Sequence, residues 1–386
     1  MDVEQRHLLH RGKFILTYQY SIASCAFGNF SFTLSSFLPS YIMFSKGLIL
    51  GMGNPLLDIS AKVQESFLKK YDMKPNNQIL AEEKHKPLYE ELVENYKVEY
   101  TVGGSTQNAL RVAQWILCEP NVTVFMGCVG KDKFSTIMET KARAEGVDVK
   151  YQYTDKEPTG TCAVLITSNG AERSLCANLA AANCFTIDHI RHPENRKLID
   201  NALYYYVSGF FLTVSPESIL EVADCALKKD SLFMMNLSAP FLSQYYSKPM
   251  MEAMPYVDIL FGNELEAAAF AKSQKFGTED LREVALKITQ LPKLNKKRPR
   301  IAIITQGENP VLLAKDGIVN EFSVTHLPPE KVIDTNGAGD AFVGGFLSQL
   351  VLGKPVETCI RCGVYAATEI IQRYGCTYEG VANFVE

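Results

Sequence analysis

The sequence predicts an α/β protein in which helices cover both faces of a mostly parallel central sheet. From Lys46 onward, short apolar runs of β character alternate with amphipathic segments. Several runs are almost continuously apolar, as expected for strands buried on both faces of a parallel sheet. This alternation is typical of layered α/β folds. Strands are predicted at 48–52, 122–126, 203–207, 232–236, 257–261 and 301–305.

Two segments show the helical period clearly. Residues 108–117 place apolar side chains at 109, 112, 113 and 116, and residues 218–227 form a second predicted helix. Two other stretches, 58–81 and 151–173, contain extended, half-polar runs. We expect these to form a small antiparallel flap beside the main sheet, because such flaps often close over a substrate. Residues 47–386 are therefore expected to form one domain, with lid segments near 58–81 and 151–180.

The first 46 residues differ in composition from the rest. From Gln5 to Leu57 there is no Asp or Glu, and an aromatic, serine-rich stretch follows Arg6, Arg11 and Lys13. Polar residues interrupt the apolar runs before they reach the ~18 residues that a spanning helix needs. A poorly ordered extension over 1–46 is the prediction, and a signal or transit peptide is the alternative.

Composition points to a globular protein with a sizeable core. The 386 residues are 47% hydrophobic, and a formal net charge of −4 provides no overall basic field. We therefore expect neither nucleic acid nor a membrane as a partner. The 10 cysteines lie mostly in apolar runs of a chain too long to need disulfides, which indicates a reducing compartment.

The most informative string is DTNGAGDAFVGGFL at 334–347. Its small residues at 337–339 predict a turn, and Asp340 opens a helix with a continuous apolar face. The N–H groups at the start of a helix suit the charge of a phosphoryl group. A carboxylate there can also accept the proton of an attacking hydroxyl. An ordinary glycine turn before an acidic helix start is the alternative from spacing alone.

Other nucleotide-binding and catalytic patterns are missing from the sequence. GMGNPL at 51–56 resembles a dinucleotide fingerprint, but Leu56 replaces the third glycine and no acid follows about 20 residues on. Neither a P-loop nor the His-Arg-Asp motif of protein kinases occurs. An Asp340 base without an adjacent His or a patterned Ser argues against a hydrolase triad.

The string at 334–347 resembles the C-terminal signature of the PfkB, or ribokinase-like, carbohydrate kinase family. TVGGSTQNA at 101–109 is similar to its N-terminal Gly-Gly turn, although a glycine turn with a Ser105 cap would explain that string in isolation. The resemblance implies a three-layer α/β/α sandwich with a small β-rich lid. It also implies transfer of the ATP γ-phosphoryl group to a hydroxyl, with Asp340 as base and the amides of 336–339 as an anion hole.

Longer strings resemble the adenosine-phosphorylating members of this family, from about Gly47 to the end of the chain. They are GMGNPLLDIS at 51–60, GTCA at 160–163, ANLAAAN at 177–183, GFFLTVSPES at 209–218, NLSAPF at 236–241 and YVDILFGNE at 256–264. The resemblance implies that the 5′-hydroxyl of adenosine accepts the phosphoryl group, giving AMP and ADP. This reaction would serve purine salvage.

The resemblance also implies site residues. Asp58 would hold the two ribose hydroxyls, assisted by Gly104 and Asn108, because a carboxylate accepts two adjacent hydroxyls well. An apolar, aromatic slot suits a flat purine, although each apolar member alone would be interpreted as core. The implied substrate-binding residues are Asn54, Leu56, Asp58, Gln78, Leu80, Gly103, Gly104, Ser105, Asn108, Cys162, Leu175, Ala177, Phe210 and Phe241.

The catalytic and ATP-side residues follow from the same resemblance. The implied catalytic residues are Asp340, Gly337, Ala338, Gly339 and Arg173, with Arg173 reaching the ATP phosphates. The implied ATP-side residues are Asn263, Glu266, Thr305, Gln306, Gly307 and Asn336. Mg²⁺ is the implied metal, organised by Glu266 through water, as suits a hard cation.

Two alternatives stay open. A ribokinase-like kinase could act on another nucleoside or a sugar, but the purine-pocket strings argue against this. A nucleoside-binding protein without catalysis is the second alternative, and the intact Asp340, Asn263 and Glu266 argue against it. We expect a monomer in the cytoplasm, with the nucleus left open, whose partners are adenosine and ATP.

Overall fold

The central sheet follows the predicted alternation of strands and helices. In the computed structural model, which describes residues 46–75, 77–167 and 172–385, nine strands form this sheet. Their order is β14 (Ile318–Phe322), β13 (Asn309–Lys315), β12 (Ile301–Gln306), β11 (Ile259–Asn263), β10 (Leu232–Asn236), β9 (Tyr204–Ser208), β1 (Ile49–Met52), β5 (Thr123–Gly130) and β6 (Asp148–Thr154). The neighbours from β12 to β6 are parallel, and β13 and β14 are antiparallel. All six predicted strands are present; β13 and β14 were not predicted, and the part of β6 that was expected to be extended, 151–154, was assigned to the flap.

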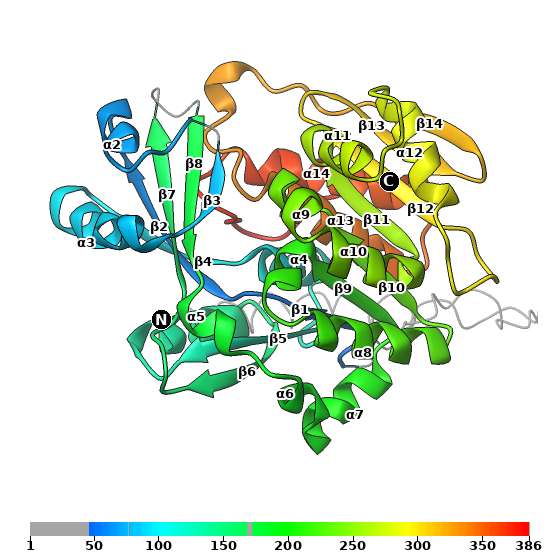
Figure 1. Ribbon diagram of the computed structural model, residues 1–386, viewed down its shortest axis with the longest axis horizontal. Helices are drawn as coiled ribbons and strands as arrows, with labels where there is room; N and C mark the ends of the chain where they lie inside the picture. Colours follow the sequence, from blue (N-terminus) through cyan, green and yellow to red (C-terminus); the bar gives the residue numbers. More distant parts are fainter. Residues whose placement is uncertain (1–45, 76, 168–171, 386) are drawn as a thin grey trace, which may run out of the picture. The chain divides into compact units, whose positions relative to one another are not determined.

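Helices cover both faces of this sheet (Figure 1). One face packs against α6 (Ile187–Arg191), α7 (Pro193–Asn201), α8 (Pro216–Lys228), α9 (Pro240–Tyr245), α10 (Ser247–Ala253), α11 (Glu264–Ser273) and α12 (Leu281–Gln290). The other packs against α4 (Ser105–Leu117), α5 (Lys133–Ala144), α13 (Ala338–Val351) and α14 (Val356–Ile370). Short 3₁₀ turns occur at η1 (Glu83–His85), η3 (Ala180–Cys184), η4 (Gly209–Thr213), η5 (Met254–Tyr256) and η6 (Pro329–Lys331). The predicted three-layer α/β/α fold is confirmed.

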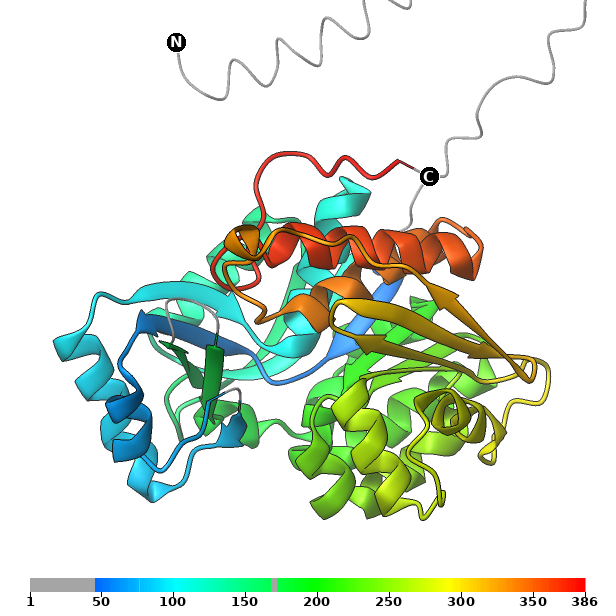
Figure 2. The same cartoon turned by 90° about the horizontal axis from the view of Figure 1, so that it is seen from above.

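A second, smaller sheet lies beside the large one (Figure 2). Its order is β3 (Gln78–Leu80), β8 (Glu172–Asn178), β7 (Thr161–Thr167), β2 (Leu56–Lys62) and β4 (Glu99–Gly103). Successive side chains of a strand point to opposite faces. In β7, Ala163 and Leu165 pack on α2 (Glu65–Lys70) and α3 (Lys86–Asn95), whereas Cys162, Val164 and Ile166 form an apolar layer on the opposite face.

The structure corrects the predicted flap in two respects. The small sheet is mixed, because β2 pairs with β7, and β3 with β8, in parallel. Residues 151–154 belong to β6, the edge strand of the large sheet, and not to the flap. The small sheet instead includes β4, which no sequence pattern indicated. The predicted extension at 1–46 lies outside the described residues, apart from Lys46.

The connections place a natural binding crevice at the end of β1. The chain passes from β1 to β5 and β6 on one side, and β9 to β12 continue on the other side of β1. In open parallel sheets, ligands bind where the strand order reverses in this way, at the carboxyl ends of the strands. The end of β1 leads directly into β2 of the small sheet, so both sheets meet at this point.

A close approach of three helices holds α13 in place. A Cβ atom on Gly344 would lie 2.5 Å from the carbonyl oxygen of Ala109 in α4, and one on Gly345 would lie 2.4 Å from that of Cys362 in α14. Real atoms do not approach so closely, so the Gly-Gly pair in the middle of α13 is required by packing. The string at 334–347, which contains Asp340, thus also determines how closely α13 packs against α4 and α14.

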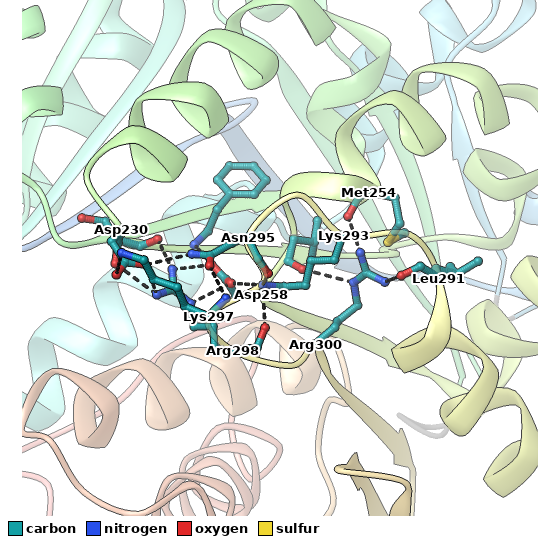
Figure 3. A network of polar contacts seen from close by, with 12 residues as sticks. Asp230, Met254, Asp258, Leu291, Lys293, Asn295, Lys297, Arg298 and Arg300 are labelled. Atoms are coloured by element: carbon teal, nitrogen blue, oxygen red, sulfur yellow. Dashed lines mark hydrogen bonds and ion pairs between the residues drawn. The ribbon is translucent and has the colours of Figure 1, made fainter.

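A polar network anchors the opposite, amino-terminal ends of β10 to β12 (Figure 3). Lys293 and Arg298 both lie 2.8 Å from the buried carboxylate of Asp258, and Arg298 also pairs with Asp230 at 2.7 Å. Arg300 is fully buried and donates to backbone carbonyls at the ends of neighbouring helices. The basic run at 293–300 therefore serves largely as internal structure.

Candidate active site

A cavity of about 790 Å³ opens where the two sheets meet, at the carboxyl ends of the parallel strands. It receives side chains from the small sheet, the loops after the large-sheet strands, and the start of α13. Within the described residues, the predicted site residues that line it are Asn54, Leu56, Asp58, Gln78, Leu80, Gly104, Ser105, Asn108, Cys162, Leu175, Ala177, Phe210, Phe241, Asn263, Glu266, Thr305, Gly307, Asn336, Gly337, Ala338, Gly339 and Asp340. Three predicted residues lie elsewhere: Gly103, Arg173 and Gln306.

One end of the cavity has the character of a slot for a flat ring. The apolar layer of the small sheet forms one wall, and the rings of Phe210 and Phe241, with centroids 6.2 Å apart, lie on the large-sheet side. Asn54 donates to the Phe210 carbonyl at 3.4 Å, but its buried Oδ1 atom has no partner within the described protein. Because a buried acceptor without a partner is costly, this atom calls for a donor on a bound molecule.

Asp58 lies on the floor of this slot. Burial, then the nearby Asp340 carboxylate, raise its pKa to about 8, against the lowering effect of Arg111. Gly103 in the neighbouring strand makes room for it, because a Cβ atom there would lie 2.1 Å from Asp58 Oδ1. The role of Gly103 in the structure is thus to admit the carboxylate, and its own atoms do not line the cavity.

Asp340 lies where the slot meets the loop at 334–339, called the glycine loop here. It accepts hydrogen bonds from Ser105 Oγ at 2.6 Å and from Asn108 Nδ2 at 3.1 Å, both in the first turn of α4. Burial raises the pKa of Asp340 to about 6, and these two bonds act in the opposite direction. A carboxylate with this pKa is ionised at neutral pH and can accept a proton, which suits general-base catalysis.

The glycine loop presents backbone N–H groups at the start of α13. Gly337 has φ +78°, a left-handed conformation that favours glycine. The N–H of Asn336 donates to Asp334 and that of Ala338 to the Thr335 carbonyl, so two of the four predicted anion-hole amides are engaged within the loop. Gly337 and Gly339 remain from the predicted set, at the positive end of the helix dipole.

The structure does not place Arg173 in the cavity. Its Nε atom donates to Asp334 Oδ1 at 2.8 Å, and its guanidinium also donates to the Ile333 carbonyl. Arg173 is 6% exposed and Asp334 is fully buried. The carboxylate of Asp334 also accepts from the N–H groups of Asn336 and Gly375, each at 2.8 Å. In this state Arg173 ties β8 to the glycine loop.

Asn263 and Glu266 form a capping box at the start of α11. The Asn263 side chain accepts from the Glu266 N–H at 2.8 Å, and Glu266 accepts from the Asn263 N–H at 3.0 Å. Burial raises the pKa of Glu266 to about 7. A buried carboxylate that resists ionisation gains from a nearby cation. In the described part of the chain no three His, Cys, Asp or Glu side chains gather as metal ligands, so a cation here would depend on phosphate and water oxygens as well.

The far end of the cavity contains residues that sequence analysis missed. Gln306, which was predicted there, instead donates to the Pro310 carbonyl within its own hairpin. The additional lining residues include Val324, Thr325, His326, Leu327, Val332, Val364, Ala367, Thr368 and Ile371. The last four have the i, i+3, i+4, i+7 spacing of one helix face. That stripe was visible in the sequence, but it is equally typical of plain core.

Comparisons with known proteins show the family of this chain. The model of the pfkB family carbohydrate kinases matches residues 66–381, which is most of the chain. The chain belongs to the PfkB family. Adenosine kinase 2 of Arabidopsis thaliana is 52% identical over 338 residues, which cover 88% of this chain and 97% of that protein. The predicted family and the predicted enzyme class, an ATP-dependent phosphotransferase, are confirmed.

Solved structures of other PfkB proteins have the same fold. Adenosine kinase of Anopheles gambiae, in complex with P1,P4-di(adenosine-5) tetraphosphate, has a TM-score of 0.84 and 57% identity, covering 88% of this chain and 100% of that one. Adenosine kinase of Schistosoma mansoni, in complex with 2-fluoroadenosine, has a TM-score of 0.84 and 37% identity, covering 87% and 98%. Among the described residues of the present chain, no helix has the length and apolar character of a membrane span.

Proposed function

We propose that this PfkB protein is an adenosine kinase, which transfers the γ-phosphoryl group of ATP to the 5′-hydroxyl of adenosine. The observation that carries the proposal is the position of Asp340, held by Ser105 and Asn108 between a purine-sized slot and a glycine loop. The Anopheles relative binds a molecule with two adenosines joined by four phosphates. A nucleoside in the slot and ATP at the far end would occupy one cavity in the same way.

The slot suits adenosine in each part. The apolar wall and the two Phe rings would hold the purine, and the partnerless Oδ1 of Asn54 would accept from a donor on the nucleoside. Asp58, assisted by Gly104 and Asn108, would accept the two ribose hydroxyls. The 5′-hydroxyl would then point along the cavity toward Asp340.

In the proposed reaction, Asp340 accepts the proton of the 5′-hydroxyl as that oxygen bonds to the γ-phosphorus. The bond from the γ-phosphorus to the bridging oxygen breaks, and ADP leaves with its electron pair, giving AMP. Gly337 and Gly339 would offer N–H groups to the transferring phosphoryl group. In phosphoryl transfer, such positioning and electrostatic stabilisation supply most of the acceleration.

Mg²⁺ fits the polar pair of Asn263 and Glu266 at the start of α11, which also lines the cavity. The buried Glu266, with a pKa raised to about 7, would be ionised more readily beside a cation. When bound with ATP, Mg²⁺ would neutralise phosphate charge, with Glu266 organising its water and Asn263 holding Glu266 in place. Arg173 could serve the same phosphates only after leaving Asp334.

The small sheet is proposed to act as a lid, since its apolar layer forms one wall of the slot. Closure over adenosine would exclude water from the phosphoryl group. We further propose that residues 47–386 act as one kinase domain with this lid, that the protein acts as a monomer, and that it works in the cytoplasm, with the nucleus left open.

The test is AMP formation by the purified protein with MgATP, comparing adenosine with ribose, inosine and fructose 6-phosphate. Turnover of adenosine alone is expected. Turnover of a sugar would keep Asp340 as base but overturn the purine slot, and tight adenosine binding without turnover would favour a non-catalytic protein.

Asp340→Asn tests the base itself. Because a positioned base contributes about 10²–10⁴-fold, or roughly 3–5.5 kcal/mol, we expect that loss in kcat with adenosine affinity preserved. The matched control is Asp188→Asn, which removes an exposed carboxylate of α6. Wild-type turnover in the Asp340 variant would remove this residue from the mechanism.

A further inference from the structure

Arg111 lies one turn after Asn108 on α4 and is buried behind the site. It is 3% exposed. Its NH1 group donates to Asn108 Oδ1 at 3.2 Å, to the Val102 carbonyl at 2.9 Å and to the Cys376 carbonyl at 3.2 Å. Its Nε and NH2 atoms donate to the two oxygens of Glu145 at 2.5 and 2.9 Å. The guanidinium is thus held by three other segments of the chain and by Asn108 of its own helix.

This contact decides which end of the Asn108 amide faces the catalytic carboxylate. An asparagine side chain carries an acceptor oxygen and a donor nitrogen, whereas arginine can only donate. Because Arg111 occupies the oxygen of Asn108, the nitrogen of Asn108 is directed at Asp340 Oδ2, 3.1 Å away. With the amide reversed, its oxygen would face the Asp340 carboxylate, acceptor against acceptor. Its nitrogen would face Arg111, donor against donor.

Arg111 is also a cation close to a group of buried acids. It lowers the pKa of Asp58, while Asp340 and Asp334 raise it. The titratable groups around Asp340 are Asp58, Glu266, Tyr206 and Cys376. Glu145, which is half-buried, balances part of the Arg111 charge from the side away from the cavity.

We propose that Arg111 is a positioning residue for phosphoryl transfer, because it orients the amide of Asn108 toward Asp340. The inference rests on the proposed role of Asp340 as base. Arg111 does not line the cavity, so it acts on the reaction through Asn108.

The first experiment replaces Arg111 by Lys, which keeps the charge but loses the planar fork that binds Glu145 and Asn108 together. Loss of one oriented hydrogen bond to a charged group corresponds to about a 10- to 100-fold loss in rate. We expect kcat with adenosine to fall by that factor, with KM for MgATP unchanged. We expect the acidic midpoint of kcat to move to higher pH, because Asp340 loses a donor.

A double-mutant cycle distinguishes positioning from general structural damage. In an Asn108→Ala background, Arg111→Lys is expected to cost less than threefold, because the amide that Arg111 orients is already gone. The matched control is Arg143→Met, which removes a half-exposed arginine of α5 that pairs with Glu139 and Asp148. Equal, additive losses in both backgrounds, or the same loss in the Arg143 variant, would overturn the proposal.

A titration of the free protein separates this proposal from the proposed function. With ¹³C-labelled aspartate, the carboxyl signal of Asp340 is assigned by its loss in Asp340→Asn. Arg111→Lys is expected to raise its midpoint, whether or not the protein turns over adenosine. An unchanged midpoint in a folded Arg111 variant refutes the positioning role, whereas absent adenosine turnover in the wild type refutes only the proposed function.

Discussion

Replacing Asp58 by asparagine is expected to stabilise the nucleoside-free protein while it abolishes nucleoside binding. Asp58 is 5% exposed, and burial raises its pKa from 3.8 to about 8. At pH 7 the folded protein therefore holds a proton on this carboxyl that the unfolded chain has lost. Asparagine has nearly the same shape and is neutral at every pH, so the variant needs no proton uptake to keep this buried side chain uncharged.

The sign and size of the effect follow from linkage. Because the folded state binds the proton more tightly, the contribution of Asp58 to stability is greatest below pH 3.8 and declines as the pH rises toward 8. Between pH 3.8, the unfolded pKa, and pH 7, this contribution falls by roughly 4 kcal/mol. Water in the cavity and local rearrangement relieve part of this loss, so we expect the variant to be more stable by about 1–3 kcal/mol.

The assay is thermal and urea unfolding without nucleoside between pH 6 and pH 9. For a chain of 386 residues, with an unfolding entropy of about 2.1 cal/mol/K per residue, this gain raises Tm by roughly 1–4 °C. The difference from the wild type should increase from pH 6 to pH 8, and calorimetry should detect no adenosine binding. Asp188→Asn, at an exposed position, serves as control. A lower Tm for Asp58→Asn, or a difference that is constant with pH, would refute the reasoning.

Two further predictions concern the phosphate end of the site. Glu266→Gln retains an acceptor for the Asn263 N–H but loses the charge, so we expect a lower kcat and a several-fold higher Mg²⁺ requirement; Mg²⁺ titrations that match the wild type would contradict this. Arg173→Met leaves the buried Asp334 carboxylate without its guanidinium partner and should reduce the free energy of unfolding by roughly 3 kcal/mol. Urea unfolding measures this loss, and a value below about 1 kcal/mol would mean that the N–H donors to Asp334 suffice on their own.

Local pattern in the sequence was sufficient for much of the fold. The six predicted strands are apolar runs buried on both faces of a parallel sheet, and such runs are recognisable without knowledge of their neighbours. The turn at Gly337 and the helix after it were also predictable, because a left-handed residue and a helix start depend on adjacent residues. The candidate base, Asp340, could be located for the same reason.

Pairing between distant segments was decided by the tertiary structure. Residues 151–154 have the half-polar character of an exposed strand, and this fits an edge of the large sheet as well as a flap. Arg173 was expected at the phosphates, yet its partner Asp334 lies 161 residues away along the chain. Neither the small sheet's mixed pairing nor the role of Arg111 has a signature in neighbouring residues.

The sequence by itself thus determined which segments are strands and helices and which string carries the chemistry. The tertiary structure decided which side chain faces which, as with Val364 and Ile371, whose helical spacing shows a buried face but not that it borders a cavity. The physical reason is that a period of 2 or 3.6 residues reports burial of one face, whereas the identity of the opposing surface depends on how the chain folds over long distances.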